Sequence, residues 1–177
     1  AMWFKGDHIA RSFPGYDPGE IVTRLNMENP MTEQGDYFTI WVGVLQLSTR
    51  ILRFASAGHP GSILVRDQVP SVVLGGKTWP VGFSPDEIYK TDEITLLDKD
   101  RLYVFSDGIY EVENADNEIW GRHRLQEALQ NVYTRPMKLG LKSLIHSSRS
   151  WQVNGLFGDD VALVGLALNE GFQEGHR

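Results

Sequence analysis

The sequence predicts an α+β fold, in which short strands form antiparallel hairpins and helices are grouped toward the two ends of the chain. Two observations support this prediction. Residues 37–74 and 91–106 are rich in β-branched and aromatic residues and are interrupted by turn residues. Residues 17–28 and 121–152 repeat apolar residues at helical spacing. Strands and helices therefore occur in separate runs and do not alternate, as they would in a parallel α/β sheet.

The first half of the chain is predicted to form one helix and two hairpins. Asp17-Pro18-Gly19-Glu20 is a helix start, because Asp is a good N-cap, Pro suits the first helical position and Glu follows three residues after the cap. Ile21, Val22 and Leu25 are then spaced to face a core. Residues 37–47 and 51–57 are predicted strands around the turn 48–50. Shorter strands are expected at 61–66 and 71–74, and a glycine- and proline-rich loop follows them.

The second half is predicted to contain another hairpin, two helices and a last strand. Residues 91–97 and 101–106 would pair across the turn Asp98-Lys99-Asp100. Helices are expected over about 121–133 and 137–152, and a strand over 161–168. Residues 169–177 are expected to be a frayed tail, and residues 1–13 give no clear prediction.

Composition indicates one globular domain over residues 1–177, with 41% hydrophobic and 23% charged residues. The net charge of −6 argues against nucleic acid or an anionic membrane as the main partner. There is no cysteine, which excludes disulfides, thiol catalysis and cysteine-ligated zinc. No apolar run approaches 18 residues or so, and the start has no signal-peptide pattern, so we expect a cytoplasmic protein without a membrane span.

Two acidic motifs, 52 positions apart, are the candidate functional residues. Asp107-Gly108 follows an apolar strand, and Asp159-Asp160 precedes another. Each motif has a simpler interpretation, since Asp-Gly is a common turn pair and charges often flank hydrophobic strands. However, adjacent carboxylates repel each other unless a cation or donor offsets the charge. Oxygen ligands at strand ends suit Mg²⁺ or Mn²⁺.

The order of motifs along the chain is more specific than any one of them. From residue 17 to residue 168 the sequence resembles the bacterial metal-dependent protein serine phosphatases of the sporulation and stress-response type, a branch of the type-2C protein phosphatases. The stretch 29–39 is similar to members that are output domains of response regulators. The motifs that carry the resemblance are Tyr37-Phe38-Thr39, Ala57-Gly58-His59-Pro60, Trp79-Pro80-Val81-Gly82, residues 100–111 around Ser106-Asp107-Gly108, residues 120–125, and Asp159-Asp160-Val161.

The resemblance implies a β-sandwich flanked by helices, with two Mn²⁺ or Mg²⁺ ions at one edge. It implies that Asp107 and Asp159 are metal ligands, that Asp160 helps to orient the site, and that Gly108 lets the backbone turn tightly beside an ion. The implied activity is hydrolysis of phosphoserine or phosphothreonine on a regulatory phosphoprotein. A substrate of the anti-sigma-factor-antagonist type, in a partner-switching stress response, is the corresponding partner.

The sequence departs from this family upstream. Two Gly-Asp motifs that supply further metal ligands are not recognisable, and Gly6-Asp7-His8 stands in the wrong context. We therefore expect a chain that lacks the family's first strands, with weak or no activity by itself. The sheet edge left open is expected to favour a homodimer. Two alternatives stay open at this point: a catalytically silent phosphatase-like module that binds such a partner, and a small-molecule metal-dependent hydrolase of another fold.

Overall fold

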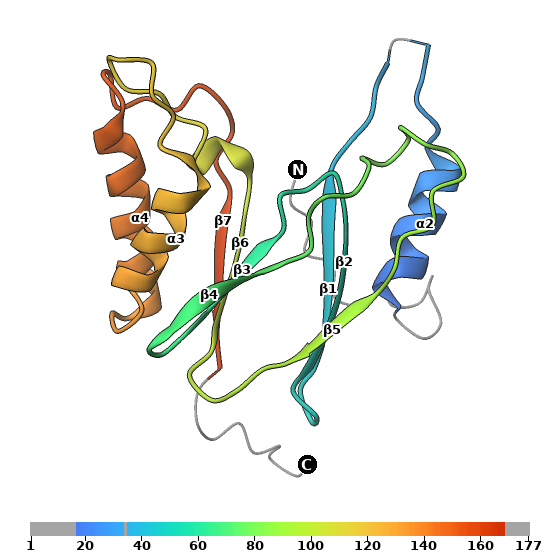
Figure 1. Cartoon of the computed structure of the whole chain (residues 1–177), viewed down its shortest axis with the longest axis horizontal. Coiled ribbons are helices and arrows are strands. Elements are labelled where there is room, and N and C mark those ends of the chain that lie inside the picture. Colours follow the sequence, from blue (N-terminus) through green and yellow to red (C-terminus); the bar gives the residue numbers. More distant parts are fainter. Residues whose placement is uncertain (1–16, 34, 169–177) are drawn as a thin grey trace. The chain divides into compact units, whose positions relative to one another are not determined.

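The computed structural model describes residues 17–33 and 35–168. These residues form two compact units, which we describe separately. The first comprises residues up to 61 together with 73–96, and the second comprises residues 62–72 together with those from 97 onward. Figure 1 shows the elements of both units. The predicted assignments for residues 1–13 and 169–177, and the Gly6-Asp7-His8 motif, lie outside the described residues.

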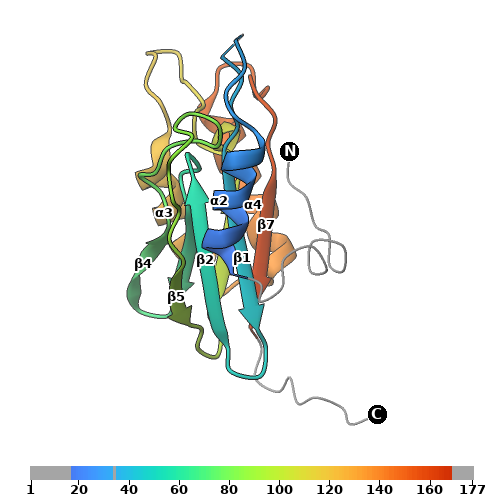
Figure 2. The same cartoon turned by 90° about the vertical axis from the view of Figure 1, so that its right-hand side faces the viewer.

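The first unit is a three-stranded antiparallel sheet with one helix. Helix α2 spans Pro18–Glu28, and the strands are β1 (Ile40–Gln46), β2 (Ile51–Ala57) and β5 (Asp92–Thr95), in the order β1-β2-β5. Helix α2 lies along one face of this sheet (Figure 2) and buries Val22 against Ala55 and Ala57. The predicted helix and the β1–β2 hairpin are therefore confirmed. Strand β1 begins later than predicted because Phe38 pairs with Val81 and not with β2.

The start of α2 is fixed by the side chain of Asp17, as the sequence predicted. Its Oδ1 atom accepts the Glu20 amide proton at 3.0 Å and the Thr91 hydroxyl proton at 2.5 Å. The hydrogen bond from Thr91 is the main cause that holds the pKa of the Asp17 carboxyl below its ordinary value of 3.8, while desolvation opposes the shift. A lowered carboxyl pKa adds stability above the ordinary pKa, and this stability is lost as the pH falls through the lowered value.

We therefore expect Asp17→Ala to cost about 1 kcal/mol of unfolding free energy at pH 7 and clearly less at pH 3.5. Urea denaturation of the 177-residue chain at both pH values measures this difference. Asp17→Asn is the matched control, since it keeps an acceptor oxygen but cannot titrate at that position. A cost of Asp17→Ala that is equal at the two pH values would contradict the linkage.

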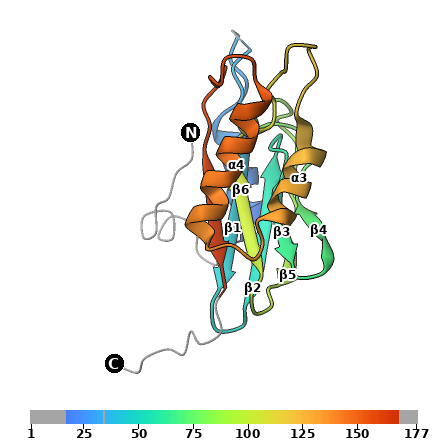
Figure 3. The same cartoon turned by 90° about the vertical axis from the view of Figure 1, so that its left-hand side faces the viewer.

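The second unit is a four-stranded sheet with two helices. Its strands are β3 (Ser62–Arg66), β4 (Val69–Leu74), β6 (Arg101–Phe105) and β7 (Leu163–Ala167), in the order β4-β3-β6-β7. Strand β6 is antiparallel to both β3 and β7. Helices α3 (Gly121–Asn131) and α4 (Met137–Trp151) cover one face of this sheet (Figure 3). Both helices and all four strands were predicted within a few residues.

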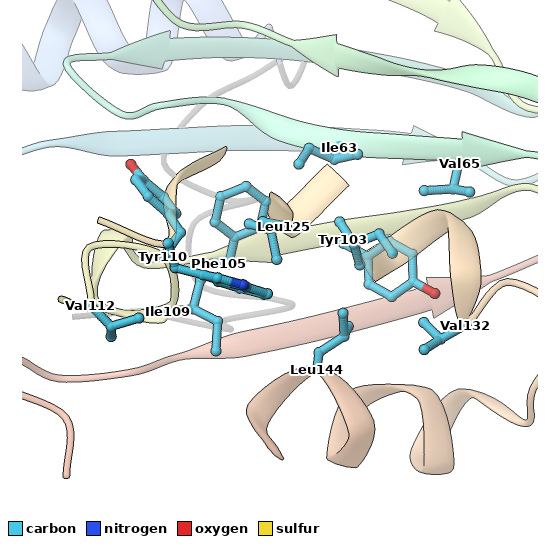
Figure 4. Packing of buried hydrophobic residues seen from close by; sticks show 12 residues of the cluster. Ile63, Val65, Tyr103, Phe105, Ile109, Tyr110, Val112, Leu125, Val132 and Leu144 are labelled. Atoms are coloured by element: carbon cyan, nitrogen blue, oxygen red, sulfur yellow. The ribbon is translucent and has the colours of Figure 1, made fainter. Parts of the chain in front are cut away.

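The core of the second unit lies between this sheet and its helices. Tyr103, Phe105, Leu125 and Leu144 are fully buried in one cluster with Ile63 (Figure 4). Leu125, Leu129 and Val132 face this core from the α3 region, at the helical spacing seen in the sequence. This packing fixes the end of β6, from which the candidate site begins.

The predicted hairpin of residues 91–97 with 101–106 is wrong. Both strands exist, but β5 pairs with β2 in the first unit, and β6 pairs with β3 and β7 in the second. The turn 98–100 is present, yet its backbone bonds the residue that follows β7: Lys99 N–H donates to the Leu168 carbonyl, and Leu168 N–H donates to the Asp100 carbonyl. The Asp100 side chain is nearly buried and accepts from Leu97 N–H and from Arg66 Nε, which provides the donors that a buried carboxylate needs.

Among the described residues, no helix is both long enough and apolar enough to cross a bilayer.

Candidate metal centre

The two acidic motifs meet at one edge of the second unit's sheet. Asp107 comes two residues after the end of β6, and Asp159-Asp160 end three residues before β7 begins. Because β6 and β7 are antiparallel, with Phe105 opposite Leu163, the end of one strand lies beside the start of the other. The turn after β6 and the segment that leads into β7 lie at the same end of these strands (Figure 1). Residues far apart in the sequence are thus neighbours.

Ser106 joins the two segments with its backbone and its side chain. Its amide N–H donates to the Ala162 carbonyl at 2.9 Å, which extends the ladder by one residue beyond β6. Its hydroxyl donates to the Asp160 carbonyl at 2.9 Å and accepts the Ala162 amide proton at 2.8 Å. The direction of both hydroxyl bonds is unambiguous, because a carbonyl only accepts and an amide N–H only donates.

A glycine is required at position 108 because the backbone of another segment lies close to it. A Cβ atom at this position would lie 2.8 Å from the carbonyl oxygen of Asp160 and 3.4 Å from that of Asp159. The φ angle of Gly108 is not in the left-handed region, so the glycine is not required by an unusual turn conformation. Steric room for the facing backbone is thus a reason for this glycine that the structure adds to the tight turn implied by the resemblance.

Asp107 opens a single 3-10 turn, η1 (Asp107–Ile109). The Asp107 carbonyl accepts the amide protons of Tyr110 and Glu111, and its Oδ1 atom accepts the Gly108 amide proton at 3.1 Å. Burial raises the pKa of the neighbouring Tyr110 to about 12, with Glu111 the next contribution, so its phenol stays neutral at physiological pH. In this turn Asp107 is therefore exposed, while the residues 108–110 that follow it are buried.

Helix α4 anchors the other end of this turn. Ser148 is fully buried, and its hydroxyl donates to the Ile109 carbonyl at 2.6 Å. Ser148 lies one helical turn after Leu144, on the face of α4 that packs on the core. That apolar face was visible in the sequence, but the partner of a serine on it was not, so sequence reasoning missed this residue.

We expect Ser148→Ala to lower the unfolding free energy by about 1–3 kcal/mol, because it leaves the buried Ile109 carbonyl without this donor. Urea denaturation measures the loss. Ser143→Ala on the same helix is a control, since Ser143 is only half-buried and its hydroxyl accepts from the surface residue Arg135. Equal losses in the two variants would contradict an anchoring role for Ser148.

The segment that carries Asp159 is attached to the end of α4. The Arg149 guanidinium lies 5.2 Å from the ring centre of Phe157, a cation–π distance. The Asp160 amide N–H donates to Asp159 Oδ1 at 2.7 Å. Both aspartates, like Asp107, are exposed, so no burial prevents a cation from approaching them.

The oxygen atoms of these two segments are of the chemical kind that binds a hard cation, but the described residues provide too few of them. Carboxylate and carbonyl oxygens are the ligands that Mg²⁺ and Mn²⁺ prefer. Within residues 17–33 and 35–168, however, no three His, Cys, Asp or Glu side chains are grouped so that they could hold a metal ion. The described residues bring the backbones of the two predicted motifs together, and ligation by Asp107 and Asp159 stays a prediction.

His59, the histidine of the Ala57-Gly58-His59-Pro60 motif, lies in the first unit. Its Nδ1 atom accepts the Gly61 amide proton at 3.1 Å, which is a local structural role.

Most of the chain is similar to one known protein family. Residues 9–169 match the family model of stage II sporulation protein E (SpoIIE). Protein IcfG of Synechocystis sp. (strain ATCC 27184 / PCC 6803 / Kazusa) is 23% identical over 150 residues, which cover 82% of this chain and 23% of that protein. The chain therefore spans about a quarter of the length of this curated relative.

Solved structures of the same fold also match. The SiaA-PP2C domain of Pseudomonas aeruginosa superimposes with a TM-score of 0.78 at 17% identity, over 92% of this chain and 65% of that one. The phosphatase domain of the cell fate determinant SpoIIE from Bacillus subtilis, presoaked with Mn, matches with a TM-score of 0.61 at 17% identity, over 98% and 77%. The type-2C-phosphatase-like fold predicted from the sequence is thereby confirmed.

Proposed function

Because this chain belongs to the stage II sporulation protein E (SpoIIE) family, we propose that it is part of a metal-dependent protein phosphatase that acts on phosphoserine or phosphothreonine. The observation that carries the proposal is the edge at which Gly108 packs directly on the Asp159-Asp160 backbone. This contact brings two carboxylate-bearing segments together at the end of β6 and the start of β7.

Asp107 and Asp159 would hold Mn²⁺ or Mg²⁺, and Asp160 would orient the Asp159 segment through its backbone. Ions of this kind, when bound in pairs, supply an activated water and neutralise charge on a phosphoryl group. The chain's own contribution is to fix the carboxylates, with Gly108 allowing the close approach of the two segments. The Mn-presoaked SpoIIE phosphatase domain supports this choice of cation.

The substrate we propose is a small regulatory phosphoprotein of the anti-sigma-factor-antagonist type, in the cytoplasm. The support is the family, together with the motif order of residues 17–168. The net charge of −6 is consistent with a protein partner and argues against nucleic acid as the partner.

A second candidate function is a silent phosphatase-like module that binds or sequesters such a partner. One observation favours it: among the described residues, no three metal-ligating side chains lie together at one place. Under this reading the Asp107 edge would be structural, and the partner would bind without being hydrolysed.

One assay separates these functions. The 177-residue chain and a longer chain, in which the family's Gly-Asp motifs are placed before residue 1, are tested side by side for Mn²⁺-dependent hydrolysis of a phosphoserine protein. We expect weak Mn²⁺ binding and little or no hydrolysis by the 177-residue chain, because waters can complete an ion's coordination but do not fix the spacing of two ions. We expect turnover by the longer chain. Binding of the phosphoprotein without hydrolysis by either chain would favour the silent module, and equal turnover by both would show that residues 1–177 already suffice.

A further inference from the structure

We propose that the Ser106 hydroxyl is a positioning group, which sets the separation between the Asp107 turn and the Asp159-Asp160 segment. The inference rests on the proposed function, because that separation matters only if both segments hold the same metal centre. Ser106 itself is not assigned a contact with metal or substrate.

The hydroxyl takes over a bond that the backbone no longer provides. In a regular antiparallel pair, Ser106 and Ala162 would exchange two backbone hydrogen bonds. Only the bond from Ser106 N–H to the Ala162 carbonyl is present. The Ser106 carbonyl turns away and accepts the Ile109 amide proton instead, as the η1 turn begins. The Ala162 N–H is therefore received by the Ser106 side chain.

The same hydroxyl reaches the acidic segment. It donates its proton to the Asp160 carbonyl at 2.9 Å. One side chain thus bonds residues 160 and 162, while its own backbone leads directly into Asp107. Since the ladder of β6 and β7 ends at the Phe105–Leu163 pair, this hydroxyl holds the two acidic segments in register where the sheet no longer does.

An alanine at this position removes both hydroxyl bonds and leaves the strands paired only up to their ends. The Asp159-Asp160 segment is exposed, so water would replace the lost partners and the segment would move more freely. Loss of an outer group that orients a metal ligand typically costs about 10–100-fold in metal affinity. Threonine keeps the hydroxyl, and its β-branched side chain suits the extended backbone of Ser106, with φ −83° and ψ 160°.

The test follows amide signals of the ¹⁵N-labelled 177-residue chain by NMR as paramagnetic Mn²⁺ is added. In the wild type, the signals of Gly108 and Asp160 should broaden over the same range of Mn²⁺ concentration. In Ser106→Ala we expect about tenfold more Mn²⁺ to be needed, and faster hydrogen exchange at the Ala162 amide. Ser106→Thr should restore both.

Ser56→Ala is the matched control. The Ser56 hydroxyl accepts the Gly76 amide proton at 2.8 Å and is buried in β2 of the first unit, so the variant loses a similar bond elsewhere. It should leave the Mn²⁺ titration unchanged. If Ser56→Ala and Ser106→Ala weaken Mn²⁺ binding equally, the effect is one of general stability and the positioning role is overturned.

Two further outcomes keep this inference separate from the proposed function. If Ser106→Ala titrates like the wild type while Asp107→Asn loses the broadening, the metal centre stands and the positioning role is overturned. If the wild type shows no Mn²⁺ broadening at either segment, the proposed metal centre fails and the inference falls with it.

Discussion

Asp107→Asn is expected to reduce Mn²⁺-dependent hydrolysis of a phosphoserine protein by about 100-fold or more, a loss beyond the 10–100-fold typical of an outer partner of a metal ligand. The measurement is made in a chain in which the family's Gly-Asp motifs are placed before residues 1–177. Asparagine has nearly the same shape and can still accept the Gly108 amide proton, as the Asp107 carboxylate does. What it lacks is the negative charge, which is the property that binds a divalent cation.

A matched control comes from the other end of the same sheet. Asp67 is exposed in the turn after β3, and the pairing of Val65 with Arg101 puts that turn beside the start of β6, away from Asp107. Asp67→Asn removes the same charge from the same unit and should leave hydrolysis within about twofold, because exposed charges at this distance are screened by salt. An equal loss in the two variants would mean that net charge, and not a metal centre, governs the activity.

Asp159→Asn should give a similar loss, and the double variant should add little to it. Residues that act together on one centre are strongly non-additive in their effects on rate. Measuring hydrolysis for the wild type, both single variants and the double variant tests this coupling. Losses that multiply in the double variant would show that the two aspartates act independently.

Local structure was predictable where one short stretch of sequence determines it. The Asp17-Pro18 start of α2 needs only the cap and the helical φ of proline, and both are visible in the sequence. Leu125 and Leu129 are about one helical turn apart, and this spacing in the sequence predicts the buried face of α3. That the Asp107 and Asp159 carboxylates lie close together was predicted through the resemblance. The residues on either side of Asp107 do contact the Asp159-Asp160 segment, and the proximity of the carboxylates stays a prediction.

Pairing between distant segments was harder to predict. Asp98-Lys99-Asp100 has the composition of a hairpin turn, but composition does not report that Leu168 bonds the backbone of this turn. The buried carboxylate of Asp100 depends on Arg66, which is 34 positions away. Ser106 and Ser148 were missed for the same reason. A serine in a motif or on a helix face gives no sign of which backbone group its hydroxyl will bond.

Phe105→Ala is expected to lower the unfolding free energy of the 177-residue chain by about 3–5 kcal/mol, the usual cost of truncating a buried phenylalanine. Phe105 is fully buried, and its ring meets that of Tyr110 edge to face, with centroids 6.1 Å apart. The buried cluster to which it belongs draws residues from β3, β6, α3 and α4 (Figure 4), so the cavity cannot close by moving a single element. Such a loss is a large part of the roughly 5–15 kcal/mol that keeps a domain folded.

Leu166→Ala on β7 of the same sheet is the control, because Leu166 is 41% exposed and its truncation removes little buried area. Urea denaturation should show a loss below about 1 kcal/mol for this variant. Phe105 also lies directly before Ser106, so the cavity loosens the end of β6 from which the Asp107 turn departs. In Phe105→Ala, under conditions where the chain is still folded, the Ala162 amide should therefore exchange its proton faster than in Leu166→Ala. Unchanged exchange at Ala162 would mean that the strand-end hydrogen bonds hold the acidic edge without support from the core beneath it.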